Sequence, residues 1–171
     1  QTLQAEIIQL DKPLSLPVEV PQNALKGSGG IGLRVSSSLA KGALDAPRNY
    51  MREYPYSCLE QQMTRAIVLD DEKLWKKIAQ TMSRYVDSNS LLRYFPQGER
   101  GSVELTSLAL EFSKLRGWDL PEATVTQLRD GLSSALNGRI DFSGYEGERL
   151  LAMKLRAAAS LAISGELSKG L

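Results

Sequence analysis

The sequence contains no histidine, and it contains a single cysteine, Cys58. Histidine is the side chain that proteins use most often as a general base and metal ligand near neutral pH, so several classes of enzyme are excluded. One cysteine cannot form an internal disulfide, and it cannot build a thiolate metal site alone. We therefore expect no cofactor and no metal ion, and a thiol that is kept for one purpose.

An excess of either charge is also missing, since Lys and Arg number 21, Asp and Glu number 20, and the formal charge is +1. Nucleic acids and anionic lipid surfaces attract proteins with basic patches. We therefore expect no nucleic-acid partner and no direct membrane contact from this segment. No apolar run approaches the about 20 residues of a membrane helix. The hydrophobic share of 42% and the aromatic share of 6% are typical of a soluble globular protein.

Residues 1–38 have the pattern of β structure. Residues 14–20 alternate between apolar and polar side chains, although Pro17 restricts this stretch to an edge or a broken strand. Ile31, Leu33 and Val35 also alternate, which is typical of a half-buried strand. Two or three strands cannot bury a core alone, so we expect this segment to belong to a larger β-sandwich.

From residue 39 onward the apolar period changes to that of helices. Pro47 predicts a kink or a break between two short helices at the start of this region. Asp70-Asp71 is a predicted cap for the second of the helices that follow. Apolar spacing predicts helices over residues 57–68, 72–85, 103–115, 121–136 and 147–163. Such helices can stack as a bundle or as a ring, and the spacing does not choose between them.

The most informative stretch is Tyr54-Pro55-Tyr56-Ser57-Cys58-Leu59-Glu60-Gln61-Gln62. Cys58 and Gln61 are three residues apart at the start of a predicted helix, which brings their Cβ atoms to within roughly 5–6 Å. A Cys58 thiolate can then attack the Gln61 side-chain amide, expel ammonia and form a thiol ester. A thiol ester has a good leaving group, so it acylates amines or hydroxyls that reach it.

This stretch resembles the thioester motif of the α2-macroglobulin and complement family, and most closely that of the bacterial α2-macroglobulin homologues. The resemblance runs from about Leu14 to the end of the chain, although Ser57 stands where glycine is usual. It implies that residues 39–171 form the N-terminal half of an α/α-toroid of helical hairpins. It also implies that residues 1–38 are part of a CUB-like β-sandwich, so the expected fold class is mainly α with a short β segment.

The resemblance further implies a broad-spectrum protease inhibitor that traps its targets and is not a turnover enzyme. A target protease cuts a bait region elsewhere in a longer chain, and the exposed thioester then captures a lysine of the protease. Cys58 would be the leaving group and Gln61 the acyl carrier. The expected partners are target proteases and other domains of the same chain. The resemblance also implies a periplasmic protein. A family member of this type is far longer than this segment, which begins at Gln1, so we expect its export signal and its lipid anchor outside the segment.

Three neighbours of the pair, Tyr54, Tyr56 and Met63, are expected to shield the thioester from water, although each could simply be part of the core. Cys58 itself could be a buried, inert cysteine. A family member with an idle thioester that only binds partners is therefore an alternative. Asp70-Asp71-Glu72 resembles the acidic metal motif of toroidal terpene enzymes, although a helix N-cap explains these carboxylates more simply.

Overall fold

The computed structural model describes residues 8, 10–17, 19, 25, 27, 29–33, 35, 44–98 and 100–165. Contacts divide the chain into two units, Gln1–Ser37 and Ser38–Leu171. The described residues of the first unit form neither strand nor helix, so the β segment expected over residues 1–38 is not seen in them. The apolar side chains of Leu16, Leu33 and Val35 are exposed. These residues have no apolar layer to cover their side chains, and a strand without a paired sheet is at best marginally stable.

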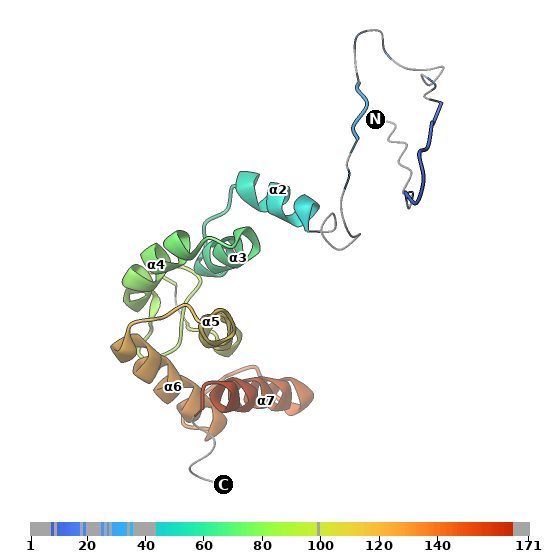
Figure 1. Ribbon diagram of the computed structural model, residues 1–171. Coiled ribbons are helices and arrows are strands. Elements are labelled where there is room, and N and C mark those ends of the chain that lie inside the picture. Colours follow the sequence, from blue (N-terminus) through green and yellow to red (C-terminus); the bar gives the residue numbers. More distant parts are fainter. Residues whose placement is uncertain are drawn as a thin grey trace. The chain divides into compact units, whose positions relative to one another are not determined.

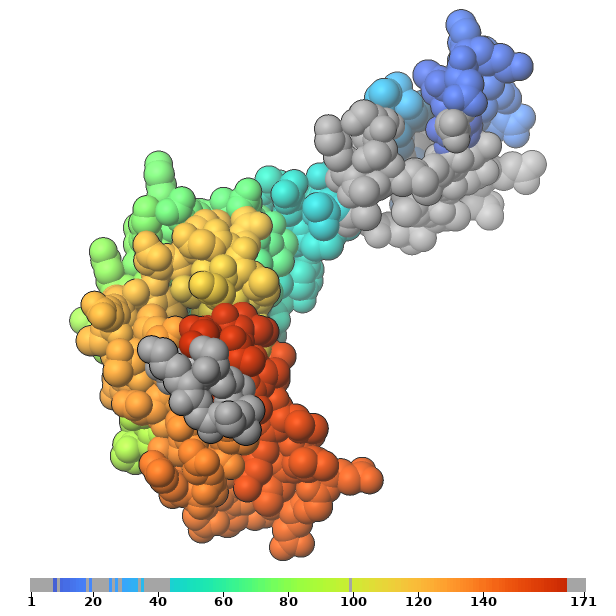
Figure 2. Space-filling view, turned by 60° about the horizontal axis from the view of Figure 1, so that its bottom comes forward, coloured from blue at the N-terminus to red at the C-terminus, as the bar shows by residue number. Residues whose placement is uncertain are grey.

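The second unit is helical, which confirms the mainly α class. Its helices, in chain order, are α2 (Asp45–Glu53), α3 (Leu59–Leu69), α4 (Glu72–Thr81), the 3-10 turn η1 (Met82–Tyr85), α5 (Val103–Arg116), α6 (Glu122–Leu136) and α7 (Gly147–Ile163). Neighbours in sequence pack together: α2 lies beside α3, α3 beside α4, and α5, α6 and α7 contact one another (Figure 1). The helices thus form two groups, α2 to α4 and α5 to α7, and contacts between α3 and α5 join them. In the space-filling view, the surface of α7 (red) adjoins that of α5 (yellow) (Figure 2).

One continuous core joins α3 to α7, whereas α2 contributes no buried residue to it. Trp75 of α4 and Trp118 after α5 have ring centroids 5.9 Å apart, and Trp75 is fully buried. The deepest side chains come from α3 to α6 and from the connection that precedes α5, and they include Leu59, Met63, Met82, Leu91, Leu92, Leu105, Leu128 and Leu132. The apolar periodicity of the sequence therefore marks the buried faces of these helices correctly.

Local capping explains where several helices begin and end. The Asp71 carboxylate accepts from the Leu74 backbone N–H at 2.9 Å at the start of α4, and the Ser102 hydroxyl accepts from Leu105 N–H at 3.1 Å at the start of α5. Gly117 ends α5 with φ of +65°, a conformation that glycine adopts without strain. These caps confirm the predicted starts of α4 and α5, and the predicted end of α5 to within one residue.

Pro47 does not break a helix in the described part of the chain. It lies in the first turn of α2, which continues without interruption from Asp45 to Glu53. A proline in the first turn removes an N–H that has no partner within the helix, so its effect on the helix is small. The predicted kink at Pro47 is therefore wrong for α2, and the helical spacing before residue 44 lies outside the described residues.

An irregular connection from residue 86 to residue 102 links the two groups of helices. It is held by two isolated antiparallel bridges, Val86 to Leu92 and Leu92 to Ser102. It also passes very close to α6, because a Cβ atom added to Gly131 would overlap the carbonyl oxygen of Ser90. None of the described helices has the length and apolar character needed to cross a bilayer.

Candidate functional site

Cys58 and Gln61 lie together at the N-terminus of α3, as the spacing predicts. Cys58 is the N-cap residue with an extended backbone, and Gln61 is the third residue of the helix. The two residues form a capping box, in which the Gln61 backbone N–H points to the Cys58 side chain and the Gln61 side-chain carbonyl oxygen accepts from the Cys58 backbone N–H at 3.4 Å. The geometry therefore places the thiol and the amide on one helical turn.

The Cys58 side of the pair is buried, whereas the Gln61 side is partly accessible to solvent. Only 6% of Cys58 is exposed, and Leu59 and Met63 below it are fully buried. Gln61 is half-buried, and Glu60 is exposed. Met63 belongs to the hydrophobic core, and it follows Leu59 by one turn of α3.

A cluster of three tyrosines leads into the site. The Gln61 side-chain N–H donates to the Tyr54 hydroxyl at 3.4 Å, so Tyr54 contacts the amide nitrogen of the predicted acyl carrier. The Tyr54 ring lies 5.0 Å from that of Tyr50 and 5.4 Å from that of Tyr56, centroid to centroid. The Tyr56 side chain itself is 67% exposed. Desolvation by burial, followed by the charge of Tyr50, raises the pKa of Tyr54 above 10.0, which keeps its hydroxyl protonated.

Two further residues hold the site in place, and the sequence motif does not reveal either role. Gln62 donates to the Ser57 carbonyl oxygen at 2.6 Å and to the Tyr85 hydroxyl at 3.4 Å, which fixes the residue that precedes Cys58. The Tyr94 carbonyl oxygen accepts from the Leu59 backbone N–H at 2.9 Å, which fastens the connection before α5 to the first turn of α3. Tyr94 is 35 positions from Leu59 in sequence, so no local spacing indicates this contact.

A small pocket of about 240 Å³ adjoins this turn, and we call it the Glu60 pocket. It is lined by Glu60 of α3, Tyr94, three residues of α5 (Glu104, Leu105 and Leu108) and Arg156 of α7. Burial raises the pKa of Tyr94; the Ser102 hydroxyl opposes this, and the negative charges of Glu60 and Glu104 add to it.

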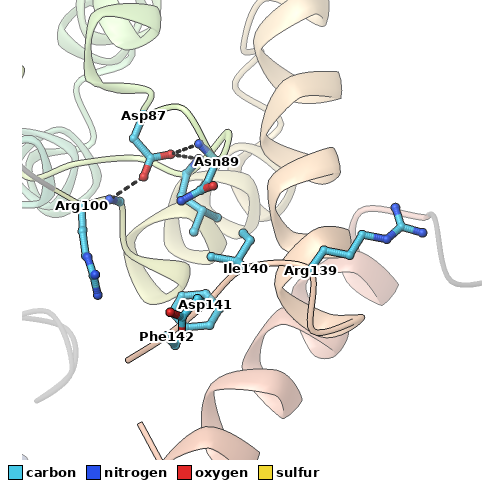
Figure 3. A pocket seen from close by; sticks show the side chains of 9 residues that line it. Asp87, Asn89, Arg100, Arg139, Ile140, Asp141 and Phe142 are labelled. Atoms are coloured by element: carbon cyan, nitrogen blue, oxygen red, sulfur yellow. Dashed lines mark hydrogen bonds between the residues drawn. The ribbon is translucent and has the colours of Figure 1, made fainter. Parts of the chain in front are cut away.

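A second pocket, of about 230 Å³, is structural in character (Figure 3). One oxygen of the Asp87 carboxylate accepts from the backbone N–H groups of Asn89 and Leu91, both at 2.9 Å, and the other accepts from Gly101 N–H at 2.8 Å. Figure 3 shows the side chains of Arg100 and Arg139 extending in different directions. The two guanidinium groups therefore do not converge on one position for a ligand.

The acidic triplet Asp70-Asp71-Glu72 is engaged in local structure. Asp71 caps α4, Glu72 pairs with Lys76 at 2.8 Å, and Asp70 forms an ion pair with Arg116. In the part of the chain that the structure describes, no three His, Cys, Asp or Glu side chains are grouped so that they could hold a metal ion. The capping interpretation of the triplet is therefore confirmed for Asp71.

Comparison with models of protein families, with curated proteins and with solved structures finds no match to this chain. The site therefore consists of a buried thiol and a primary amide on one helical turn, with a tyrosine hydroxyl on the amide nitrogen.

Proposed function

We propose that this chain is part of a broad-spectrum protease-trapping inhibitor of the α2-macroglobulin type, and that Cys58 and Gln61 form its internal thioester. The observation that carries the proposal is the pairing of these two residues across the first turn of α3. The resemblance of residues 54–62 to the thioester motif of bacterial α2-macroglobulin homologues supports it. On this proposal, target proteases and other domains of the same longer chain are the partners.

The proposed architecture and location follow the same resemblance. Residues 39–171 are the N-terminal half of an α/α-toroid, and the lateral packing of neighbouring helices supports this arrangement. Residues 1–38 are part of a CUB-like β-sandwich that other segments complete. The whole protein is periplasmic, with a lipid anchor outside this segment.

The chemistry consists of two acyl transfers. In the first, the Cys58 sulfur attacks the side-chain carbonyl carbon of Gln61, a C–S bond forms, the C–N bond breaks, and the amide leaves as ammonia with the thiol proton. In the second, the neutral amine of a protease lysine attacks the same carbon. The C–S bond breaks, an isopeptide bond forms, and one amine proton passes to the Cys58 thiolate. The trap acts once, so it is a binder and not a catalyst.

Water must be kept from the bond until capture. Tyr54, Tyr56 and Met63 are the proposed shield. Tyr54 lies beside the Gln61 side chain, because its hydroxyl accepts from the amide nitrogen that leaves when the thioester forms. Met63 would act from below as part of the core, and Tyr56 by covering Tyr54. Exclusion of water by such side chains sets the lifetime of a reactive intermediate.

Intact-mass measurement of freshly folded protein tests the proposal. A formed thioester makes the protein lighter by one ammonia, and incubation with methylamine then adds one methylamine. Cys58→Ser is the matched control, because its hydroxyl retains the cap of α3 but lacks the thiol. A native protein with the full sequence mass, and with no methylamine adduct, would refute the covalent trap.

The burial of Cys58 also favours a second candidate, in which the pair is idle and the domain binds partners without a covalent bond. The same mass measurement separates the two, since an idle pair retains the full mass. A toroidal terpene-type enzyme has no comparable support, because the carboxylates of residues 70–72 are engaged in local contacts.

A further inference from the structure

The exposed surface of α7 carries no charge over most of its length. From residue 150 to residue 163, every residue of this helix that is exposed is apolar. We call these residues the α7 face, and they are Leu151, Ala152, Leu155, Ala159, Ala162 and Ile163. Leu151 is 58% exposed, Leu155 60% and Ile163 42%. The exposed residues of α4, α5 and α6 include charged side chains in each helix. The α7 face therefore differs from its neighbours in the way that marks an interaction surface.

Helical geometry places the α7 face on one side of the helix. Ala152 and Ala159 are seven residues apart, as are Leu155 and Ala162, and seven residues make about two turns. The buried residues of α7 lie on the opposite side, which packs against α5 and α6 (Figure 1). The face is thus a continuous apolar stripe that points away from the core of its own chain.

The α7 face is complementary to itself. When a second α7 lies antiparallel across it, with the twofold axis at Ala157, each position opposes the position equally far beyond Ala157 in the other copy. Leu151 then opposes Ile163, Ala152 opposes Ala162, and Leu155 opposes Ala159. Every member of the face meets another member, and the large Leu155 meets a small alanine, so the two helices can approach closely. A twofold contact requires this kind of reciprocal pairing.

The charges beside the α7 face do not oppose a second copy. Arg156 is half-buried, and its guanidinium is bound by the Glu111 carboxylate at 2.6 Å, in an ion pair between α7 and α5. The formal charge of the whole chain is only +1. Two copies therefore approach each other without strong electrostatic repulsion.

The size of the α7 face sets the strength of the contact. From Leu151 to Ile163 it is about 18 Å long, and a helix is about 10 Å wide, so each copy offers on the order of 200 Å². Stable complexes bury about 800 Å² on each partner. The contact is therefore that of a weak dimer, which forms at high protein concentration.

We infer that the α7 face is a self-association site, and that the partner it fits is a second copy of this chain. The two copies pack antiparallel through the same six residues in a twofold dimer. The inference goes beyond the proposed function and does not require a thioester. The dimer carries two copies of the Cys58 and Gln61 pair in one assembly.

Sedimentation equilibrium of the 171-residue chain tests the inference at loading concentrations from about 10 µM to about 1 mM. The average mass should rise from that of one chain toward that of two, and added salt should not weaken the association, because the contact is apolar. Leu155→Glu should weaken it at least about tenfold, since a carboxylate enters the apolar contact twice in each dimer. Leu115→Glu is the matched control, because Leu115 is a 74% exposed leucine of α5 outside the α7 face. Thermal unfolding of both variants shows that each is folded.

Two variants together test the antiparallel pairing. Residue 155 of one copy opposes residue 159 of the other, so Leu155→Glu and Ala159→Lys restore one contact as an ion pair and leave the other apolar. Their mixture should associate more strongly than either variant alone, and an equally weak mixture would overturn this pairing. A native chain that stays monomeric at about 1 mM would overturn the self-association site and leave the α7 face to another segment of a longer chain. Equal weakening by Leu155→Glu and Leu115→Glu would also overturn it.

Discussion

The backbone N–H of Cys58 donates to the side-chain carbonyl oxygen of Gln61 across 3.4 Å. The amide that the thiol would attack is thus held by the backbone of the same cysteine. Residues 58–61 lie on one helical turn, so the two side chains of the proposed thioester start from neighbouring positions.

Cys58 should be unreactive toward thiol reagents in freshly folded protein and should become titratable after methylamine is added. The thioester blocks the sulfur, and aminolysis releases it as a free thiol. A colorimetric thiol titration before and after methylamine measures both states. A titration in denaturant with no amine is the control for burial, since burial alone would also hide the thiol, and an intact thioester would remain closed. Full titration of the denatured protein before amine addition would contradict the prediction.

Gln61→Glu should abolish amine incorporation and change the free energy of unfolding by less than about 0.5 kcal/mol. A carboxylate does not acylate a thiol readily, yet glutamate retains the capping box and suits the N-terminus of a helix. Incorporation of labelled methylamine and urea unfolding measure the two effects. Gln127→Glu, at an exposed position of α6, provides the control for the added charge. An adduct on Gln61→Glu that survives boiling in detergent would show that another group is the acyl carrier.

Stability should fall as the pH rises above 10. Burial is the first cause of the raised pKa at both Tyr54 and Tyr94, whose ordinary value is 10.0. The folded state therefore retains the phenolic protons more strongly than the unfolded state. Its advantage is complete below pH 10 and is lost as the pH rises through the folded pKa. Urea unfolding between pH 8 and pH 11 measures this loss, and it should be smaller in a Tyr54→Phe, Tyr94→Phe variant. An identical loss in that variant would assign the effect to other groups.

Asp87→Asn should destabilise the protein by about 1–3 kcal/mol, because the Asp87 carboxylate accepts from three backbone N–H groups and an amide has only one acceptor oxygen. Asp141→Asn is the matched control. Asp141 lines the same pocket, but its carboxylate accepts from the exposed Ser143 hydroxyl at 3.1 Å. Thermal or urea unfolding of the two variants gives the comparison. Equal stabilities would show that the connection before α5 does not depend on Asp87.

The sequence predicts features that depend on neighbours along the chain. The bounds of α7, Gly147–Ile163, agree with those expected from apolar spacing and turn residues, and the meeting of Cys58 with Gln61 follows from helical geometry alone. Features that join distant positions are missed. Tyr94 reaches Leu59 from the connection before α5, and Arg156 reaches Glu111 from another helix, and neither pair leaves a periodic signal. Pro47 misleads because its effect depends on whether it lies inside a helix or in its first turn.

The hydrogen bond from Leu59 to the Tyr94 carbonyl oxygen makes one amide a built-in reporter for the connection of residues 86–102. The first amides of a helix ordinarily exchange their protons with solvent quickly, because no carbonyl in the same helix protects them. Leu59 is protected instead by a residue from outside the helix. Deuterium uptake at Leu59 thus records how often the connection lifts away from α3, independently of unwinding of the helix itself.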